Sequence, residues 1–275
     1  MTADAAAEGP DTAPLLELAE QIAREAGRLI VEERPRDLGV ATTKTSVTDI
    51  VTEMDQRAEQ LLVDRITTAR PDDGILGEEG AARAGTSGVT WVVDPIDGTV
   101  NYVYEIPSYA VSVAARVGDD VVAGAVVNPV SGEVWTALRG EGAWLDGRRL
   151  VLGEPPELAM ALVATGFGYD PRRRSAQAAV LQVVLPQVRD VRRAGAASLD
   201  LCAVATGRVD AYYEQGLKPW DLAAGGLVAR EAGAVVTGLH GRQAGEALVV
   251  AARPPLVGAL VSVLEGLAAD ADPLA

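Results

Sequence analysis

The stretch WVVDPIDGT, residues 91–99, decides the fold of this chain and directs the search for its function. Asp94 ends an apolar run, a proline and Gly98 impose a sharp turn, and Asp97 follows inside that turn. Two carboxylates that converge on one point offer the oxygen ligands that Mg²⁺ prefers, and the main-chain carbonyl of Ile96 could supply another. Taken alone, the same residues are equally consistent with an Asx-type turn, because Asp, Pro and Gly all favour turns.

Two more acidic segments favour a metal site over a simple turn. Glu78 and Glu79 follow the apolar run GIL after one glycine, and Asp221 follows Trp220 at the start of a predicted helix. Each segment has a structural alternative, because Glu79 could be a solvated surface charge and Asp221 a helix N-cap. Together with the two aspartates of the turn, however, they form a set of carboxylates without histidine or cysteine, which is the composition of a magnesium site.

The apolar periodicity predicts a chain of mixed helices and strands. Helical spacing of leucine and isoleucine indicates amphipathic helices over residues 14–33 and 53–69, and two short apolar runs that end in carboxylates indicate strands at GILGEEG and TWVVDP. Valine-rich runs separated by turn residues predict an antiparallel meander over residues 110–150. Beyond Pro155 we expect helices at 174–185, 197–206, 220–232 and 256–268 and strands at 210–214, 234–238 and 247–252.

The domain organisation predicted from these patterns is one compact unit with two fused halves. A soft boundary separates a metal-binding half, residues 13–150, from a second α/β half, residues 151–268, that carries Asp221. Residues 1–12 and 269–275 are rich in Ala, Asp and Pro, and we predict that both are frayed tails.

Composition limits the possible partners. With 48% hydrophobic residues over 275 positions the chain can form a large core, while a net charge of −15 opposes binding to nucleic acid or to an anionic membrane. No apolar run reaches the ~18 residues that predict a membrane span, and the N-terminus lacks a signal-peptide pattern, so we expect a cytoplasmic protein. An anionic phosphate substrate would need local positive charge, which bound metal supplies.

The single cysteine and the single histidine limit the chemistry further. Cys202 excludes an internal disulfide framework and a multi-thiolate zinc site, and its amphipathic surroundings predict a buried structural thiol. His240 lies between glycines in a predicted turn and is a poor candidate for the base of a serine triad.

The ordered set GEEG, WVVDPIDGTVNYVYEIPSYAVSVA and WDLAAGGLVAREAGA resembles the inositol monophosphatase family of Mg²⁺-dependent, lithium-sensitive phosphatases. The segment RRAGAASLDLCAVATGRVDAYYEQGLKPWD supports the resemblance, which covers most of residues 14–268 and is greatest to the actinobacterial inositol-1-monophosphatases. It implies an α/β (α+β) fold, the layered αβαβα sandwich of the inositol monophosphatase and fructose-1,6-bisphosphatase type. It also implies a homodimer.

The resemblance implies a set of metal ligands. Glu78, Asp94 and the Ile96 carbonyl would hold one Mg²⁺, and Asp94, Asp97 and Asp221 a second, so that Asp94 bridges the pair. A third, more weakly held ion is expected near Glu78.

The family pattern also implies catalytic roles. Gly98 and Thr99 would open a short helix whose N–H groups receive the phosphate. A metal-activated water would attack phosphorus without a covalent enzyme intermediate, and Thr99, oriented by Asp55, would help Glu78 to position that water or accept its proton. Asp55 has an alternative role as the third residue of a helix capping box that begins at Thr52.

The remaining predicted site residues would bind the substrate, which we expect to be a small phosphorylated polyol. The resemblance places Glu214 on a ring hydroxyl of the alcohol, Ala197 on the adjacent wall and Arg192 on the same side. Lys44 matches a family position near the metals, although a solvated surface lysine is the alternative. Residues 166–175 do not align with the family's substrate-facing loop, so the alcohol stays undetermined.

The same residues can be compared with the motifs of other enzyme classes. A haloacid-dehalogenase mechanism needs DxDGT, whereas two residues separate Asp94 from Asp97, and GEGAWL and GFGYDP do not complete the dinucleotide motif GxGxxG. Within the superfamily the alternatives are histidinol-phosphate phosphatase, fructose-1,6-bisphosphatase and 3′-phosphoadenosine-5′-phosphate phosphatase. A non-enzymatic regulatory binding protein is the alternative from another class, and the complete ligand set argues against it.

Overall fold

An eight-stranded sheet forms the first half of the computed structural model, which describes residues 12–35, 42–43, 50–51, 53–272 and 274. Only the neighbours β3 and β5 run parallel, and the pairs from β5 to β10 form the predicted antiparallel meander. In spatial order its strands are β10 (Arg148–Leu150), β9 (Gly142–Leu145), β8 (Val134–Leu138), β7 (Asp120–Val127), β6 (Ala110–Val117), β5 (Val89–Asp97), β3 (Gly74–Gly77) and β4 (Ala82–Arg83).

A second, five-stranded sheet belongs to the C-terminal part of the chain. Its spatial order is β12 (Asp190–Arg192), β11 (Leu162–Thr165), β13 (Ala211–Glu214), β15 (Val249–Ala252) and β14 (Val235–Thr237). The sequence analysis did not predict β11 and β12, which are short. The first sheet ends at Leu150 and the second begins with β11, so we propose that the two fused halves meet between these strands.

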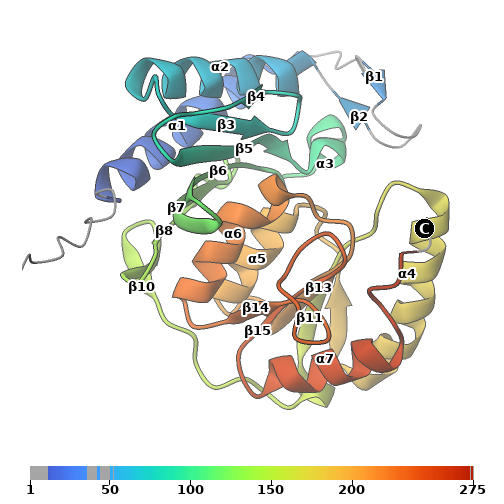
Figure 1. Ribbon diagram of the computed structural model, residues 1–275. Coiled ribbons are helices and arrows are strands. Elements are labelled where there is room, and N and C mark those ends of the chain that lie inside the picture. The colour runs from blue at the N-terminus through green and yellow to red at the C-terminus, as the bar shows by residue number, and fades with distance from the viewer. Residues whose placement is uncertain (1–11, 36–41, 44–49, 52, 273, 275) are drawn as a thin grey trace, which may run out of the picture.

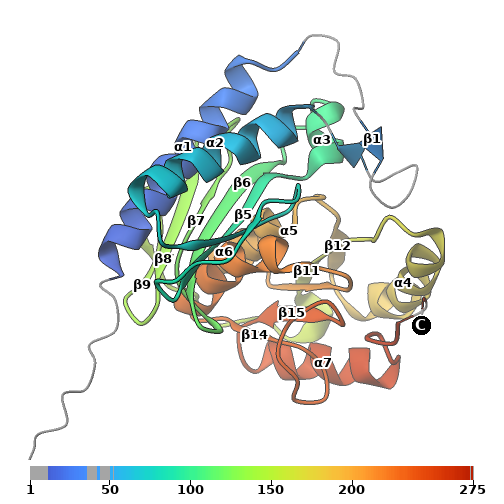
Figure 2. The same ribbon diagram turned by 45° about the horizontal axis from the view of Figure 1, so that its top comes forward.

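Helices separate and cover the two sheets, which gives five layers (Figures 1 and 2). Helices α1 (Ala13–Glu32) and α2 (Glu53–Ala69) cover the outer face of the first sheet, and α5 (Ala197–Ala205) and α6 (Pro219–Glu231) lie between the sheets. Helices α4 (Pro171–Val184) and α7 (Leu256–Gly266) cover the outer face of the second sheet. The predicted αβαβα layering is therefore present. The smaller elements are β1 (Thr42–Thr43), β2 (Ile50–Val51), α3 (Thr99–Val103), and the 3₁₀ turns η1 (Leu158–Met160) and η2 (Leu185–Gln187).

Helix α1 shows how the periodic pattern becomes a layer. Leu15, Ala19, Ile22, Ala26 and Ile30 recur every three or four residues and are all buried against the first sheet. This single apolar face matches the helical period, so burial rather than intrinsic propensity fixes the helix.

The central layer is tight because glycine allows α5 and α6 to approach closely. A Cβ on Gly225 of α6 would lie 2.9 Å from the carbonyl oxygen of Ser198 and 3.1 Å from Cβ of Leu201, both on α5. Gly124 of β7 makes a similar approach to Ala224 of α6, at 3.0 Å from its Cα. Small residues at these points let the two central helices and the first sheet fix one another's positions.

Candidate active site

A bulge in β5 brings Asp94 and Asp97 to the same side of the sheet. Asp94 pairs with Ser112 of β6 and Asp97 with Ala110, so three steps along β5 match two steps along its partner. Residues three apart in a regular strand point to opposite faces, and the extra residue of the bulge cancels that alternation. The proline-containing turn predicted at this point is therefore a bulge that aims two carboxylates at one site.

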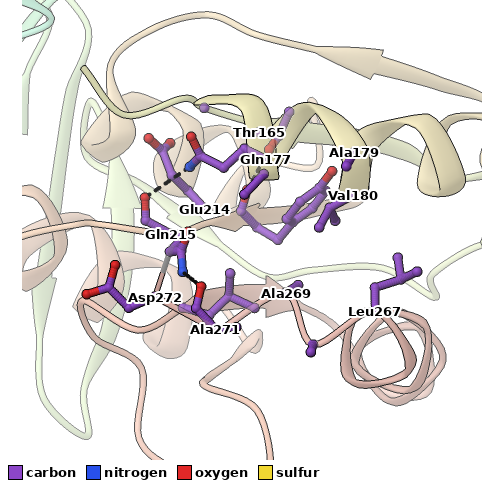
Figure 3. Close-up of a pocket in the computed structure, with 15 residues that line it drawn as sticks. Thr165, Gln177, Ala179, Val180, Glu214, Gln215, Leu267, Ala269, Ala271 and Asp272 are labelled. Atoms are coloured by element: carbon purple, nitrogen blue, oxygen red, sulfur yellow. Dashed lines mark hydrogen bonds between the residues drawn. The ribbon is translucent and has the colours of Figure 1, made fainter. Parts of the chain in front are cut away.

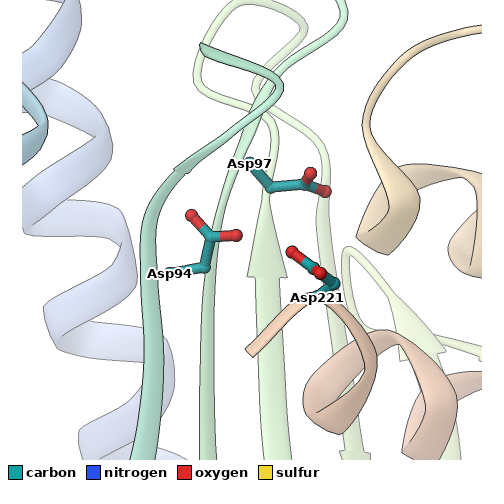
Figure 4. A group of neighbouring side chains, drawn as sticks. All are labelled: Asp94, Asp97 and Asp221. Atoms are coloured by element: carbon teal, nitrogen blue, oxygen red, sulfur yellow. The ribbon is translucent and has the colours of Figure 1, made fainter. Parts of the chain in front are cut away.

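Asp221 joins this pair from the start of α6. Carboxylate oxygens of Asp94, Asp97 and Asp221 all lie within 4.8 Å of one another, and Figure 4 shows the three side chains turned toward a common point. The alternative that Asp221 is the helix N-cap is wrong, because Lys218 occupies that position. Asp221 is the third helical residue, and its Oδ2 accepts a hydrogen bond from the Lys218 main-chain N–H at 2.6 Å.

Glu78 reaches the same pocket on the loop after β3. A buried carboxylate on α2, that of Glu59, holds this loop by accepting hydrogen bonds from the main-chain N–H groups of Glu79 (2.8 Å) and Ala81 (2.9 Å). Glu78 lines the pocket with Asp94, and its charge contributes to the raised pKa of that aspartate. The structure thus brings together all four predicted carboxylate ligands.

The side chain of Asp97 is held at the N-terminus of α5. It accepts hydrogen bonds from the main-chain N–H groups of Ala197 (3.2 Å) and Ser198 (2.7 Å), and from the Ser198 hydroxyl (2.5 Å). These donors stabilise the charged carboxylate. Burial nevertheless raises the pKa of Asp97 to about 6, because desolvation outweighs the donors and Glu78 adds repulsion.

The other two aspartates are perturbed in the same direction. Burial is the main cause that raises the pKa of Asp94 well above its usual value, and repulsion from Glu78, Asp97 and Asp221 raises it further. Burial, and then repulsion from Asp97 and Glu78, also raises the pKa of Asp221. A cluster of carboxylates that repel one another in a buried pocket is stabilised by a cation.

The donor set fits a hard divalent cation. Every predicted side-chain ligand is a carboxylate, the three aspartates converge from two elements, and Ile96, whose carbonyl is the predicted main-chain ligand, lines the same pocket. Oxygen-only ligands in this number suit Mg²⁺, Mn²⁺ or Ca²⁺ and do not suit a thiolate or imidazole metal site.

Thr99 lines the same pocket as the carboxylates, and its hydroxyl contacts Asp55. The Thr99 hydroxyl is 3.2 Å from Oδ1 of Asp55 and 3.1 Å from the Ile96 carbonyl oxygen, and Asp55 is completely buried in the first turn of α2. Its alternative role in a capping box involves Thr52, which lies outside the described residues. Gly98 has φ of 93°, a left-handed conformation that favours glycine, and a Cβ there would lie 3.0 Å from the Ser108 carbonyl oxygen.

The end of the pocket where we expect the alcohol to bind, the alcohol end, contains Glu214, Ala197 and an arginine. The whole pocket has a volume of about 510 Å³. Glu214 is at its edge, and its Oε2 accepts a hydrogen bond from the Tyr212 hydroxyl at 2.7 Å. Burial raises the pKa of Glu214 to about 7, while Tyr212 and Arg193 oppose the rise.

The predicted arginine is displaced by one residue. Arg192 has a side chain that is 54% exposed and pairs with Asp190 at 2.6 Å, and it does not line the pocket. Arg193 lines the pocket instead. Consecutive residues at the end of a strand face opposite ways, so only one of these two neighbouring arginines faces the pocket. Lys44 lies outside the described residues.

A smaller cavity of about 340 Å³ adjoins the alcohol end through Gly166, Glu214 and Gln215. The buried side chain of Gln215 donates to the carbonyl oxygen of Ala271 at 2.8 Å, and Gln177 of α4 donates to the carbonyl oxygen of Gln215 at 3.2 Å (Figure 3). The described part of the predicted C-terminal tail is therefore attached to the strand that carries Glu214.

Two other predictions can be checked directly. Cys202 is buried on α5, and burial raises the pKa of its thiol, as a structural role requires. His240 sits in a turn with φ of 56°. Neither residue lines the active-site pocket.

Glu59, Ser198 and Arg193 were not predicted from the sequence. Glu59 follows Asp55 by four residues and precedes apolar Leu62 by three, so an acid on the buried stripe of an amphipathic helix was a usable signal. Ser198 and Arg193 gave no comparable signal, because their roles depend on contacts with residues far away in the sequence.

The fold and this site are those of a metal-dependent phosphomonoesterase. Residues 11–273 match the family model described as Inositol monophosphatase family, and the chain belongs to that family.

Named relatives and solved structures agree with this placement. Inositol-1-monophosphatase SuhB of Mycobacterium tuberculosis (strain ATCC 25618 / H37Rv) is 47% identical over 277 residues, which cover 93% of this chain and 96% of that protein. The crystal structure of extragenic suppressor protein suhB from Bartonella henselae superposes with a TM-score of 0.86 at 34% identity, covering 92% of this chain and 99% of the other. A relative from Haemophilus influenzae, 40% identical over 81% of this chain and 84% of its own length, is named Nus factor SuhB.

None of the helices in the described part of the chain combines the length and apolar character that a membrane span requires.

Proposed function

We propose that this chain hydrolyses the phosphomonoester of a small polyol, myo-inositol 1-phosphate, to the free alcohol and inorganic phosphate with Mg²⁺ as its cofactor. The convergence of Asp94, Asp97 and Asp221 within 4.8 Å is the observation that carries this proposal. The name of the mycobacterial relative supports the choice of substrate. We further propose, on the family resemblance, a cytoplasmic homodimer.

The carboxylates would hold the metal ions. Glu78, Asp94 and the Ile96 carbonyl would form one site, and Asp94, Asp97 and Asp221 a second, with a third and weaker ion near Glu78. When bound, such ions supply a nucleophilic water at neutral pH and stabilise charge on the leaving oxygen. Ser198 and Lys218 keep two of these ligands in place, because their donors fix Asp97 and Asp221.

Thr99 and Asp55 would help to position the water that loses a proton during hydrolysis. The reaction adds water across the P–O bond, so one proton leaves the attacking water and one must reach the alkoxide. Thr99 already donates toward Asp55 at 3.2 Å, which leaves its oxygen lone pairs free to accept from a water in the pocket. We propose that Thr99, oriented by Asp55, positions this water and that Glu78 accepts its proton. A solvent water then protonates the alkoxide, and Glu78 returns its proton to solvent.

Arg193 and Glu214 would both interact with the substrate. The Arg193 guanidinium, which lines the pocket of an acidic chain, would attract the anionic substrate into the pocket. Glu214 would accept a hydrogen bond from a hydroxyl of the alcohol, and its contact with Tyr212 fixes the carboxylate for that task. Ala197 leaves room for a ring next to it.

The proposal is tested by phosphate release from a substrate panel. The purified chain would be assayed on myo-inositol 1-phosphate, histidinol phosphate, fructose 1,6-bisphosphate and 3′-phosphoadenosine 5′-phosphate, each with Mg²⁺ and with EDTA. We expect Mg²⁺-dependent release that is fastest with inositol 1-phosphate. Faster turnover of another substrate would identify a different alcohol as the natural one. No turnover of any substrate would reject the proposal that the chain is a phosphatase.

A regulatory binding role is a second candidate, because the Haemophilus influenzae relative is named Nus factor SuhB. The four carboxylates of the metal site favour catalysis, and the charge of −15 disfavours direct contact with nucleic acid. The two roles are separable in a strain that lacks the gene. Restoration of the phenotype by the Asp94→Asn variant would favour the binding role, and failure of a folded variant would favour catalysis.

A further inference from the structure

Two glutamines connect three segments that surround the alcohol end of the active-site pocket. Gln177 of α4 accepts a hydrogen bond from the main-chain N–H of Gly168 at 2.9 Å and donates one to the carbonyl oxygen of Gln215 at 3.2 Å. Gln215, which directly follows Glu214, donates in turn to the carbonyl oxygen of Ala271 at 2.8 Å (Figure 3). One chain of amide hydrogen bonds therefore runs from Gly168 to Ala271.

Each of these segments contributes to the active-site pocket. Residues 166–170 all line it, Gln215 lines it where β13 ends, and Leu274 lines it from the segment that follows α7. The first of these segments also packs on the carboxylate that we expect to bind the alcohol, because a Cβ on Gly166 would overlap the side chain of Glu214. A shift of any one segment would therefore change the space around Glu214.

Apolar packing does little to fix the positions of these segments. Val184 is the one residue of α4 that is buried, and a cavity of about 340 Å³ lies between α4, β13 and the segment that follows α7. Gln177 and Gln215 both line this cavity, and Gln215 is 5% exposed, so water competes little for its amide group. Where close packing is missing, these shielded hydrogen bonds determine how the segments lie.

We infer that Gln177 and Gln215 are positioning residues that set the selectivity of the enzyme for its alcohol, a role that rests on the proposed function. They hold residues 166–170 and the segment that follows α7 against Glu214. A glutamine amide can donate and accept at the same time, as Gln177 does, whereas an ionised glutamate can only accept. A pocket discriminates between alcohols when its polar groups are held where a hydroxyl can meet them.

The metal-binding carboxylates depend on other contacts. Asp97 and Asp221 accept hydrogen bonds from the main-chain N–H groups of Ser198 and Lys218, and neither donor belongs to the chain of glutamine amides. Loss of a glutamine amide should therefore weaken binding of the alcohol and leave the hydrolytic step unchanged.

Steady-state kinetics on two substrates with Mg²⁺ test this role. Gln215→Met keeps the length of the side chain but removes the donor to the Ala271 carbonyl. We expect kcat/KM for inositol 1-phosphate to fall about 3- to 10-fold, through a higher KM at unchanged kcat. The value for 4-nitrophenyl phosphate should change little, because that ester lacks ring hydroxyls.

Two further variants separate this role from a general loss of folded protein. Gln177→Met should change the ratio of the two kcat/KM values in the same direction. In the variant that combines it with Gln215→Met the two losses should not multiply, because both residues belong to one network. The matched control is Gln187→Met, which removes a glutamine hydrogen bond to a main-chain carbonyl, that of Val183 at 2.9 Å, outside the pocket. This control should match the wild type on both substrates.

A shortened chain keeps the test decisive if the methionine variants do not fold. Ending the chain after Asp270 preserves the ion pair of that residue with Arg242 and removes Ala271 and Leu274. It should raise the KM for inositol 1-phosphate and change the turnover of 4-nitrophenyl phosphate little. An unchanged ratio in this chain or in folded Gln215→Met, or equal losses on both substrates, would overturn the inference. Absence of Mg²⁺-dependent turnover of both substrates by the wild type would refute the proposed function, and this inference with it.

Discussion

The carboxylate end and the alcohol end of the active-site pocket are built in different ways. At the carboxylate end, main-chain donors hold Asp97 and Asp221, and a strand bulge fixes Asp94 relative to Asp97. At the alcohol end, Glu214 has one side-chain donor, Tyr212, and Arg193 makes no hydrogen bond or ion pair with the described residues. Main-chain contacts depend on the fold, whereas side-chain contacts change with single substitutions. The fold thus fixes the metal-binding carboxylates more firmly than the residues that would select the substrate.

The largest effect is expected at the carboxylate end. Asp94→Asn removes the charge that would be shared between two metal ions, so kcat should fall on the order of a thousandfold or more. The loss should be similar for inositol 1-phosphate and for 4-nitrophenyl phosphate, because the metal acts on the phosphate that both share. A variant that keeps wild-type turnover would reject the site, and one that discriminates between the alcohols would break the comparison.

A smaller and selective effect is expected at the alcohol end. Glu214→Gln preserves shape but removes the charged acceptor, and hydrogen bonds to charged groups contribute about 1.5–3 kcal/mol. We expect kcat/KM for inositol 1-phosphate to fall about 10- to 100-fold. The value for 4-nitrophenyl phosphate, which lacks ring hydroxyls, should change little. Equal losses on both substrates would make Glu214 a structural residue.

Lithium should reduce turnover severalfold at the carboxylate end. Li⁺ is close to Mg²⁺ in size but has half the charge, so it would stabilise the leaving oxygen less in the position near Asp97 and Asp221. Steady-state assays in LiCl, with equal KCl as the control, should show inhibition that more inositol 1-phosphate does not relieve. Full activity in millimolar LiCl at limiting Mg²⁺ would reject this account of the second metal position.

The smallest effect concerns stability without metal. A carboxyl whose folded pKa is raised binds its proton more tightly when folded, so the folded state loses stability as pH rises above the unfolded value near 4. For Asp97 that loss falls between pH 3.8 and about 6. Burial and repulsion raise the pKa of Asp94 in the same direction, so in EDTA at pH 7.5 Asp94→Asn should be more stable than the wild type by about 1 kcal/mol, and the difference should shrink as the pH falls toward 4. Urea unfolding at both pH values measures this, and a less stable variant at pH 7.5 would contradict it.

The sequence predicted the layers better than it predicted contacts between them. The helices at α1 and α2 and the meander from β6 to β10 follow from local apolar periods, and the structure confirms them. Strands β11 and β12 were not predicted, although β13 and β14, which have the same lengths of four and three residues, were, so strand length alone does not explain the difference. Their pairing depends on the rest of the second sheet.

The site residues also divide into those that a local motif predicts and those that depend on contacts between distant segments. Asp94 and Asp97 could be paired from one local motif, and the ordered motifs added Glu78 and Asp221. The step from Arg192 to Arg193 could not be predicted, because it depends on which way the end of β12 faces. Ser198 could not be predicted either, since it meets Asp97 across 101 residues of sequence.

The central claim is that Asp94 bridges two metal ions, and anomalous diffraction from crystals soaked in Mn²⁺ tests it most directly. Mn²⁺ accepts the same oxygen ligands as Mg²⁺ and scatters anomalously. We predict two peaks about 3.5–4 Å apart with Asp94 between them, one toward Glu78 and one toward Asp97 and Asp221, and loss of both in Asp94→Asn. Mn²⁺-activated wild-type crystals without a peak at these carboxylates would contradict the account.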